Sequence, residues 1–199
     1  MDTVKNVKEL DIYDFDKTML PFDCGSRFCI YCAKHYLNNF DYVPKVAVAG
    51  IKFLFNRNLT GFKNIAFSFI NKIPLQEAVN GFWDENEKYI YDWVKKENRE
   101  RYSVIISASP DFLIKEIARR IEVDDYISTT HDDNGKIIGK NCHDKEKVRL
   151  FKNRYPDAKV INVYSDSIKN DKYIFSLAEN CFYVKDNVAN RFNFADVYK

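Results

Sequence analysis

The sequence of 199 residues predicts an α/β fold with a mainly parallel sheet and one large helical insertion. Strand-like runs alternate with helical segments after residue 100, an order typical of parallel βαβ units. One further strand-like run, residues 10–13, stands before a stretch from 21 to 99 whose apolar residues recur at helical spacing. We therefore predict a core of residues 1–20 and 100–199 and an all-helical insertion of residues 21–99.

Local signals define the individual elements. Breaks at 56–58 and 72–74 divide the insertion into separate helices. A buried strand is predicted at 103–107, and Ser109 and Pro110 predict a helix start as N-cap and first helical residue. The remaining elements are predicted as a strand at 126–130, a hairpin turn at 132–135 with a return arm at 136–139, a helix at 145–154, a strand at 160–164, a helix at 173–178 and a strand at 181–184.

The composition is that of a globular protein. Hydrophobic residues make up 46% of the chain, which is enough for a sizeable core. The net charge of +2 is too close to neutral to indicate a nucleic-acid partner, and we expect none. Charges such as Lys5 and Lys8 argue against a signal peptide, and no apolar run reaches the length of a transmembrane helix. We therefore expect a cytoplasmic protein, and the oligomeric state stays open.

Two carboxylates, Asp14 and Asp16, follow the first predicted strand. Residues two apart point to the same face of an extended chain, so these side chains can converge where the strand ends. In an open α/β sheet, ligands bind outside the carboxyl ends of the strands. Nearby carboxylates repel each other unless a proton or a metal intervenes. The pair therefore indicates a divalent cation or a nucleophile beside an acid/base, although Asp-x-Asp is also common in turns and helix caps.

Further polar residues fall at the ends of predicted strands or the starts of helices. Ser107 ends a buried strand in front of a helix N-terminus, an arrangement that favours an anion. Lys147 lies near the start of a helix, and Asp166 and Asp171 follow another buried strand. Each alone can be a capping serine, a solvated lysine or a turn aspartate. Together, in this order on an α/β pattern, they indicate one site.

These residues resemble the motifs of the haloacid dehalogenase (HAD) superfamily, in its phosphoserine-phosphatase-like branch (subfamily IB) with a helical C1 cap. The first motif, D-x-D-x-T, is matched by Asp14, Asp16 and Thr18. The second, a serine or threonine that ends a hydrophobic strand, is matched by Ser107. Lys17 stands where glycine is usual in many relatives.

The third and fourth motifs lie further along the chain. Residues 139–148 resemble G-x-N-C-x-G-x-E-K-V, which aligns the family lysine with Lys147. The acidic fourth motif is matched around Asp166. Its second acidic position is either Asn170, which has the expected spacing, or Asp171, which the residues that follow favour.

The resemblance implies a Rossmann-like three-layer core and Mg²⁺-dependent hydrolysis of a phosphate monoester through an aspartyl-phosphate. Asp14 would be the nucleophile, Asp16 the acid/base, and Lys147 a third catalytic residue that stabilises charge. The implied phosphate-binding residues are Ser107, Ala108, Lys147, Thr18 and Arg27. The implied metal ligands are Asp14, Asp16 through its backbone carbonyl, Asp166, and Asp171, which would support the water shell of the metal or hold Lys147.

A second register is excluded. Asp16-Lys17-Thr18 also resembles the phosphorylation site of P-type ATPases, in which the first aspartate is the nucleophile. Thr18 would then stand at the acid/base position, and ion pumps need transmembrane helices that the sequence does not indicate.

The insertion has no Asp or Glu between Tyr42 and Gln76 and is basic and aromatic. Such a segment can pack as a cap, close over an anionic substrate or lie on an anionic membrane. We expect a small phosphorylated substrate, with phosphoserine not the first choice. The alternatives are a phosphatase or phosphotransferase acting on a lipid or membrane-associated phosphate, and a non-catalytic phosphate-binding or scaffold protein. The basic and aromatic residues include Lys45, Lys52, Arg57, Lys63, Lys72, Phe53, Phe55, Phe62, Phe67 and Phe69.

Three cysteines lie close together at Cys24, Cys29 and Cys32. Their C-x4-C-x2-C spacing matches part of an iron–sulfur pattern, with a fourth ligand required from Cys142 or Cys181. The run from residue 24 reads as a helix, so buried, reduced side chains are the favoured interpretation.

Overall fold

The computed structural model describes residues 4–36, 39–56 and 58–198. Its centre is a six-stranded sheet of order β3-β2-β1-β4-β5-β6, in which only the β5–β6 pairing is antiparallel. The predicted α/β class with a mainly parallel sheet is therefore confirmed. The strands are β1 (Glu9–Tyr13), β2 (Tyr102–Pro110), β3 (Asp125–Thr129), β4 (Lys159–Ser165), β5 (Ala178–Lys185) and β6 (Val188–Phe192).

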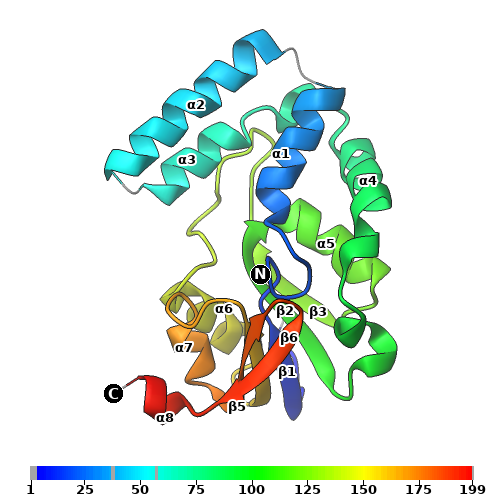
Figure 1. Cartoon of the computed structure of the whole chain (residues 1–199), viewed down its shortest axis with the longest axis vertical. Helices are drawn as coiled ribbons and strands as arrows, with labels where there is room; N and C mark the ends of the chain where they lie inside the picture. Colours follow the sequence, from blue (N-terminus) through cyan, green and yellow to red (C-terminus); the bar gives the residue numbers. More distant parts are fainter. Residues whose placement is uncertain (1–3, 37–38, 57, 199) are drawn as a thin grey trace.

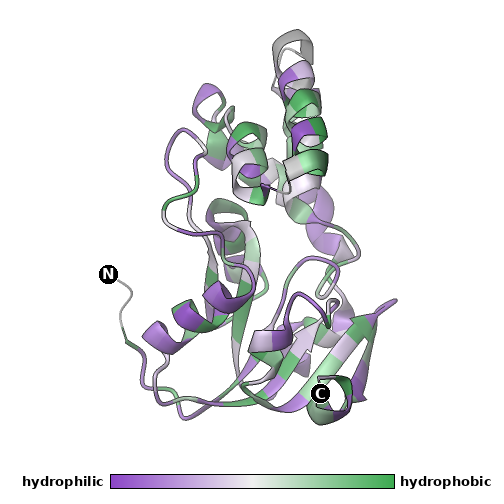
Figure 2. Ribbon diagram, turned by 90° about the vertical axis from the view of Figure 1, so that its left-hand side faces the viewer, coloured by the Kyte–Doolittle hydropathy of each residue, from purple (hydrophilic) through white to green (hydrophobic). Residues whose placement is uncertain are grey.

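Side chains on alternate positions of β1 enter two different hydrophobic clusters. Leu10 and Ile12 pack in a cluster with Phe151 and Phe175, whereas Tyr13 packs in a cluster with Leu113. This alternation covers both faces of the sheet and gives three layers, as expected for a buried parallel sheet. The core helices are α5 (Asp111–Arg120), α6 (Lys145–Arg154), α7 (Lys172–Phe175) and α8 (Phe194–Val197). Hydrophobic residues run along the strands of the sheet in Figure 2.

The described part of residues 21–99 contains helices and 3-10 turns and no strand. Helices α1, α2 and α3 gather beyond the carboxyl ends of the strands (Figure 1). None of the described helices combines the length and apolar character that a membrane crossing needs. The elements are α1 (Cys24–His35), α2 (Asn39–Asn56), α3 (Leu59–Ala66), α4 (Leu75–Asn86) and 3-10 turns at Ile70–Lys72, Glu87–Tyr89, Asp92–Val94 and Lys96–Asn98.

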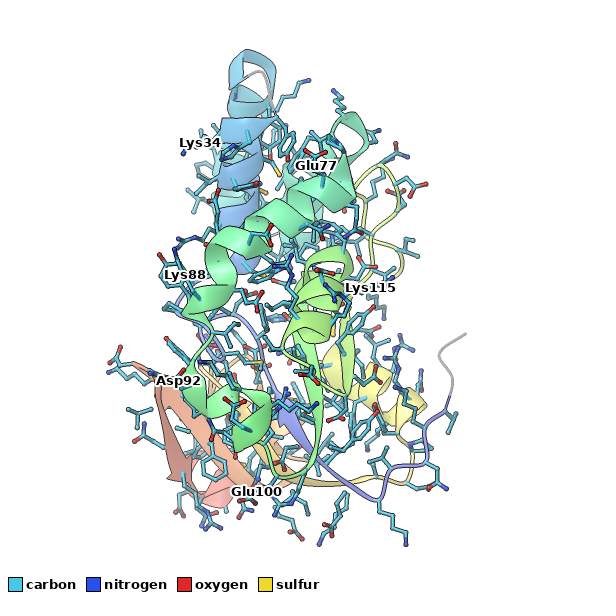
Figure 3. The ribbon with its side chains drawn as sticks, turned by 90° about the vertical axis from the view of Figure 1, so that its right-hand side faces the viewer. Lys34, Glu77, Lys88, Asp92, Glu100 and Lys115 are labelled. Carbon is cyan, nitrogen blue, oxygen red and sulfur yellow. The ribbon has the colours of Figure 1, made fainter. Side chains whose placement is uncertain are left out.

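The last part of this block shares a core with the sheet. The chain descends from Glu77 on α4 past Lys88 and Asp92, beside the helix that carries Lys115 (Figure 3). The Trp83 indole of α4 is fully buried and donates a hydrogen bond of 3.0 Å to the Leu113 carbonyl of α5. Whether residues 21–99 form a separate unit remains a prediction, because α4 packs continuously onto the core.

Several predicted boundaries differ from the structure. Pro110 still belongs to β2, and α5 begins at Asp111, because the Ser109 hydroxyl donates to Asp16 instead of capping the helix. The predicted hairpin arm at 136–139 is reduced to a single bridge between His131 and Ile137.

The C-terminal elements also differ. The helix predicted at 173–178 ends at Phe175, and β5 already begins at Ala178. Strand β6 and helix α8 were not predicted. Asp186 and Asn187 form the turn into β6, both with positive φ, a combination that lacks the glycine by which such hairpins are usually found.

Two glycines with nearly equal φ, Gly135 (76°) and Gly139 (75°), allow a matched test of packing against strain. A Cβ at Gly135 would lie 1.9 Å from the Phe67 carbonyl oxygen, whereas one at Gly139 would meet nothing within 4 Å. We expect Gly139→Ala to lower the free energy of unfolding by about 1 kcal/mol and Gly135→Ala by about 3 kcal/mol or more. Urea denaturation measures both, and equal losses would contradict the close approach of the 135 turn to Phe67.

Candidate active site

The site lies where β1, β2 and β4 end side by side. The register pairs Tyr13 with Ile105 on one side and with Tyr164 on the other, so the residues that follow meet at one edge. The Asp14 amide continues this pairing with a 2.9 Å hydrogen bond to the Tyr164 carbonyl. Parallel strands thereby bring together the segments that carry Asp14, Ser107 and Asp166, as the sequence predicts.

Lys147 forms the centre of the charged cluster. Its Nζ lies 2.7 Å from Asp14 Oδ1 and 2.7 Å from Asp171 Oδ1, and the side chain is almost fully buried on α6. The second oxygen of Asp171 accepts from the Ser165 hydroxyl. Burial disfavours the ammonium, but the two carboxylates outweigh it and raise the pKa of Lys147. Asp171 therefore holds Lys147, whereas Asn170, the other candidate for this position, is exposed.

Asp14 has hydrogen-bond partners on both oxygens. Its Oδ2 accepts from the Thr18 hydroxyl at 3.2 Å, and that hydroxyl accepts from the Asp166 amide at 2.9 Å. Thr18 thus links the first and fourth motifs. Burial raises the pKa of Asp14 to about 7, opposed by Lys147 and supported by the charges of Asp171 and Asp16. The carboxylate is short of positive charge, a condition that a cation would relieve.

Asp16 is held by a different set of donors. Its Oδ1 accepts from the Cys24 amide at 2.7 Å, and its other oxygen accepts from the Ser109 hydroxyl. Burial, followed by the charge of Asp23, raises the pKa of Asp16 to about 6. An acid/base works best with a pKa near the working pH. The next residue, Lys17, has a φ of 59°, a left-handed conformation that glycine adopts without steric cost.

Ser107 and Ala108 line the end of β2. The Ser107 oxygen accepts from the Ser109 amide at 3.0 Å, so its own proton stays available to an incoming anion. The Ala108 carbonyl accepts from Lys63 Nζ of α3 at 2.7 Å. Lys63 Nζ also lies 3.0 Å from Asn141 Oδ1, and burial lowers the pKa of Lys63.

Sequence reasoning missed the parts played by Ser109, Ser165 and Lys63. Ser109 was assigned to a helix cap, and Lys63 was one of several cap lysines with nothing to distinguish it. Ser165 carried a usable signal, since it ends a buried strand just as Ser107 does. Arg27, a predicted phosphate ligand, instead lies with its guanidinium 4.2 Å from the centre of the Phe22 ring and 5.1 Å from that of Tyr89. Its phosphate contact remains a prediction.

The oxygen ligands at this edge of the sheet suit a divalent cation. Among the described residues, no three His, Cys, Asp or Glu side chains form a ready cluster. Mg²⁺ does not need one, because it is usually held by one or two carboxylates together with waters and substrate phosphate. Asp14 and Asp166 supply two hard oxygen ligands, and burial raises the pKa of Asp166, with the charge of Asp171 adding to it. The residues present therefore fit Mg²⁺.

The cysteines near residue 24 lie on a helix, in agreement with the favoured interpretation of the sequence. Cys24, Cys29 and Cys32 all lie on α1, and all five cysteines are free thiols. Burial raises the pKa of Cys29 to about 12. These side chains pack on α1, and Cys24 also reaches the site, because its backbone amide and its thiol both contact Asp16.

An acidic pair, a buried lysine and a strand-ending serine at the carboxyl edge of a parallel sheet define a site for phosphoryl chemistry. A family model described as haloacid dehalogenase-like hydrolase matches residues 12–173, and the chain belongs to this family. No curated protein matches the chain in a sequence search.

Solved structures share the fold at low identity. A protein of unknown function from Bordetella pertussis Tohama I has a TM-score of 0.64 at 16% identity, with 79% of this chain and 82% of that one covered. A probable phosphoserine phosphatase from Vibrio cholerae has a TM-score of 0.62 at 12% identity, covering 87% of this chain and 55% of that one. A phosphoserine phosphatase in apo form has a TM-score of 0.57 at 14% identity, with 87% and 84% covered. The chain therefore has the fold of HAD phosphatases.

The buried charges predict a pH-dependent stability in metal-free buffer. Folding raises the pKa of Asp14 to about 7, so above pH 4 the folded protein retains a proton that the unfolded chain has lost. The free energy of unfolding therefore falls as pH rises from about 4 to 7, by up to about 1.4 kcal/mol per pH unit for each such group. Lys147→Gln should steepen this fall and cost about 3 kcal/mol at pH 8, because Asp14 and Asp171 lose their counter-charge.

Urea denaturation in EDTA at pH 5 and pH 8 measures this effect. Lys145→Gln, an exposed change on the same helix, is the control and should leave the profile unchanged. If Lys147→Gln lowers the free energy of unfolding by the same amount at both pH values, the charge argument is contradicted.

Proposed function

We propose that the protein is a Mg²⁺-dependent phosphatase that hydrolyses a phosphate monoester through an aspartyl-phosphate on Asp14. The observation that best supports this proposal is that the two carboxylates, Asp14 and Asp16, have different surroundings. Asp14 contacts Lys147 and Thr18, whereas Asp16 is held apart by Ser109 and the Cys24 amide. One carboxylate is thus embedded among phosphate- and metal-binding groups, and the other faces the insertion.

Two steps follow from this arrangement. In the first, an Asp14 oxygen attacks phosphorus, the bond from phosphorus to the ester oxygen breaks, and Asp16 gives its proton to the leaving alkoxide. In the second, Asp16 takes a proton from water, which attacks phosphorus and releases inorganic phosphate, restoring Asp14. A pKa of about 6 lets Asp16 serve as both acid and base near neutral pH.

The remaining residues bind the phosphoryl group. Ser107 offers its free hydroxyl proton, Ala108 its backbone amide, and Lys147 its ammonium to the equatorial oxygens, where negative charge develops. Thr18 fixes the orientation of Asp14. Asp14, Asp166 and the Asp16 carbonyl would hold Mg²⁺, with Asp171 acting through Lys147. The ion supplies charge neutralisation between the nucleophile and the phosphate. We also propose that the protein is cytoplasmic.

The test compares Asp14→Asn with wild type on p-nitrophenyl phosphate, with Mg²⁺ and with EDTA. We expect wild-type turnover to require Mg²⁺ and Asp14→Asn to lose at least about a thousandfold, because an amide cannot form the phosphoenzyme. Asp16→Asn should be severely impaired and accumulate phosphoenzyme, detectable by mass spectrometry. Asp133→Asn, on an exposed turn, is the control. Substantial activity in Asp14→Asn would overturn the nucleophile, and an inactive wild type that still binds phosphate would favour the scaffold alternative.

The outer face of α2 favours a second candidate, action on a membrane-associated phosphate. Val48, Ile51, Leu54 and Phe55 are all exposed on α2, and Phe55 is 86% exposed. Lys45 and Lys52 are exposed on the same helix. An exposed apolar stripe flanked by lysines suits the surface of an anionic membrane. We call residues 48, 51, 54 and 55 the α2 face.

Cosedimentation with vesicles tests this candidate. We expect binding to vesicles that contain phosphatidylserine, weakened by salt, and at least about tenfold weaker in Ile51→Glu. Ile138→Glu is the matched control, because Ile138 and Ile51 are both 56% exposed and Ile138 lies outside α2. Equal binding by both variants, or no binding by wild type, would end the membrane candidate.

A further inference from the structure

An apolar cavity of about 310 Å³ opens next to the acid/base, between α1, α2 and α3 and the end of β2. This size is at the lower end of the range for small-molecule sites. Figure 1 shows these three helices grouped on the side of the sheet where β1 and β2 end. The cavity walls are mainly hydrophobic and include Ile30, Val46, Leu59, Phe62, Phe67 and Pro110.

Two contacts join the cavity to Asp16. Ser109 lines the cavity and donates its hydroxyl to the Asp16 carboxylate. Gly25, also in the lining, follows Cys24, whose amide donates to the other Asp16 oxygen. The leaving oxygen must reach Asp16 to receive its proton. The organic group attached to that oxygen is therefore directed towards this cavity.

Most polar side chains of the lining already have partners in the protein. Asp23 accepts from the Ser26 amide as the N-cap of α1, and Ser109 donates to Asp16. Lys63 donates to the Ala108 carbonyl and to Asn141. A leaving group with its own ammonium, carboxylate or sugar hydroxyls would lose water here and meet few free partners in these mainly apolar walls, which is costly. An alkyl chain or an aromatic ring would lose no hydrogen bonds to water on entering the cavity.

We propose that the substrate is a phosphate monoester of an apolar alcohol, whose hydrocarbon part occupies this cavity while its phosphate binds at Asp14 and Lys147. This inference rests on the phosphatase function proposed above and specifies the substrate class of the same site. The alcohol could be a free metabolite or a lipid, and both share the same chemistry at the cavity.

A homologous series of soluble alkyl phosphates, from methyl to octyl and below their micelle concentrations, tests the proposal. We expect kcat/KM to rise about fourfold for each added methylene, the factor that corresponds to about 0.8 kcal/mol of burial, and then to level off once the cavity is full. Phosphoserine should be slower than butyl phosphate. Dependence on chain length is the diagnostic quantity, because the phosphate chemistry is the same throughout the series.

A variant whose cavity is filled by a larger side chain provides the comparison with wild type. Val46→Trp places a large ring in the lining and should flatten the chain-length series, so the ratio of octyl to methyl phosphate turnover falls at least about tenfold. Val188→Trp, an exposed change on β6, should keep both the ratio and the overall activity. Circular dichroism confirms that each variant is folded. The wild-type series alone still decides the matter if Val46→Trp does not fold.

The outcomes separate the two proposals. Turnover of methyl and p-nitrophenyl phosphate with no dependence on chain length would overturn the apolar substrate and leave the phosphatase intact. No turnover of any ester with Mg²⁺ would overturn both. A further arm presents a long-chain phosphate monoester in phosphatidylcholine–phosphatidylserine vesicles. Turnover there that exceeds the soluble octyl ester and is lost in Ile51→Glu identifies a membrane lipid as the source, whereas turnover independent of vesicles identifies a free ester.

Discussion

The buried ammonium of Lys147 is the interaction on which the rest of the site depends. It lies 2.7 Å from both Asp14 and Asp171, so three charges from three separate segments are removed from water together. One ammonium cannot neutralise two carboxylates, and the neighbouring Asp16 and Asp166 add to the excess. Burial is the main reason why the pKa values of Asp14, Asp16 and Asp166 are raised, and neighbouring carboxylates add to the effect. A divalent cation would offset the surplus of negative charge.

Much of this architecture could be predicted because it depends on short-range patterns. The buried strands are mostly apolar runs, and α6 has the predicted bounds of 145 and 154. Parallel pairing then brings the strand ends to one edge. Asp14, Ser107 and Asp166 could therefore be assigned to one site without knowing any long-range contact. The choice between Asn170 and Asp171 was different, since spacing favoured Asn170 and the residues that follow favoured Asp171. The contact between Asp171 and Lys147 supports the second.

Features in which a long-range contact replaces the local one were missed by sequence analysis. The Ser109-Pro110-Asp111 signal for a helix start is sound locally, but the buried Asp16 carboxylate takes the Ser109 hydroxyl and moves the boundary by one residue. Lys63 was one lysine among several in an acid-free stretch, and only packing brings it to Ala108. The turn at Asp186 and Asn187 lacks glycine, so its left-handed conformation carries only the weaker signal of Asp and Asn, and β6 was missed.

The way the helical block is attached limits how the site can open. Trp83 of α4 is buried against α5 and bonded to the Leu113 carbonyl, and the Tyr91 amide donates to the Met19 carbonyl directly after the catalytic loop. Swinging this part away would expose a large aromatic surface and leave buried polar groups unpaired. Helix α3 is attached by polar bonds: Lys63 Nζ donates to the Ala108 carbonyl, and Asn64 Oδ1 accepts from the Ile137 amide. Burial lowers the pKa of Lys63. Of the helices that line the cavity, α2 already exposes the four residues of the α2 face, so we expect a shift of α2 to cost the least buried surface.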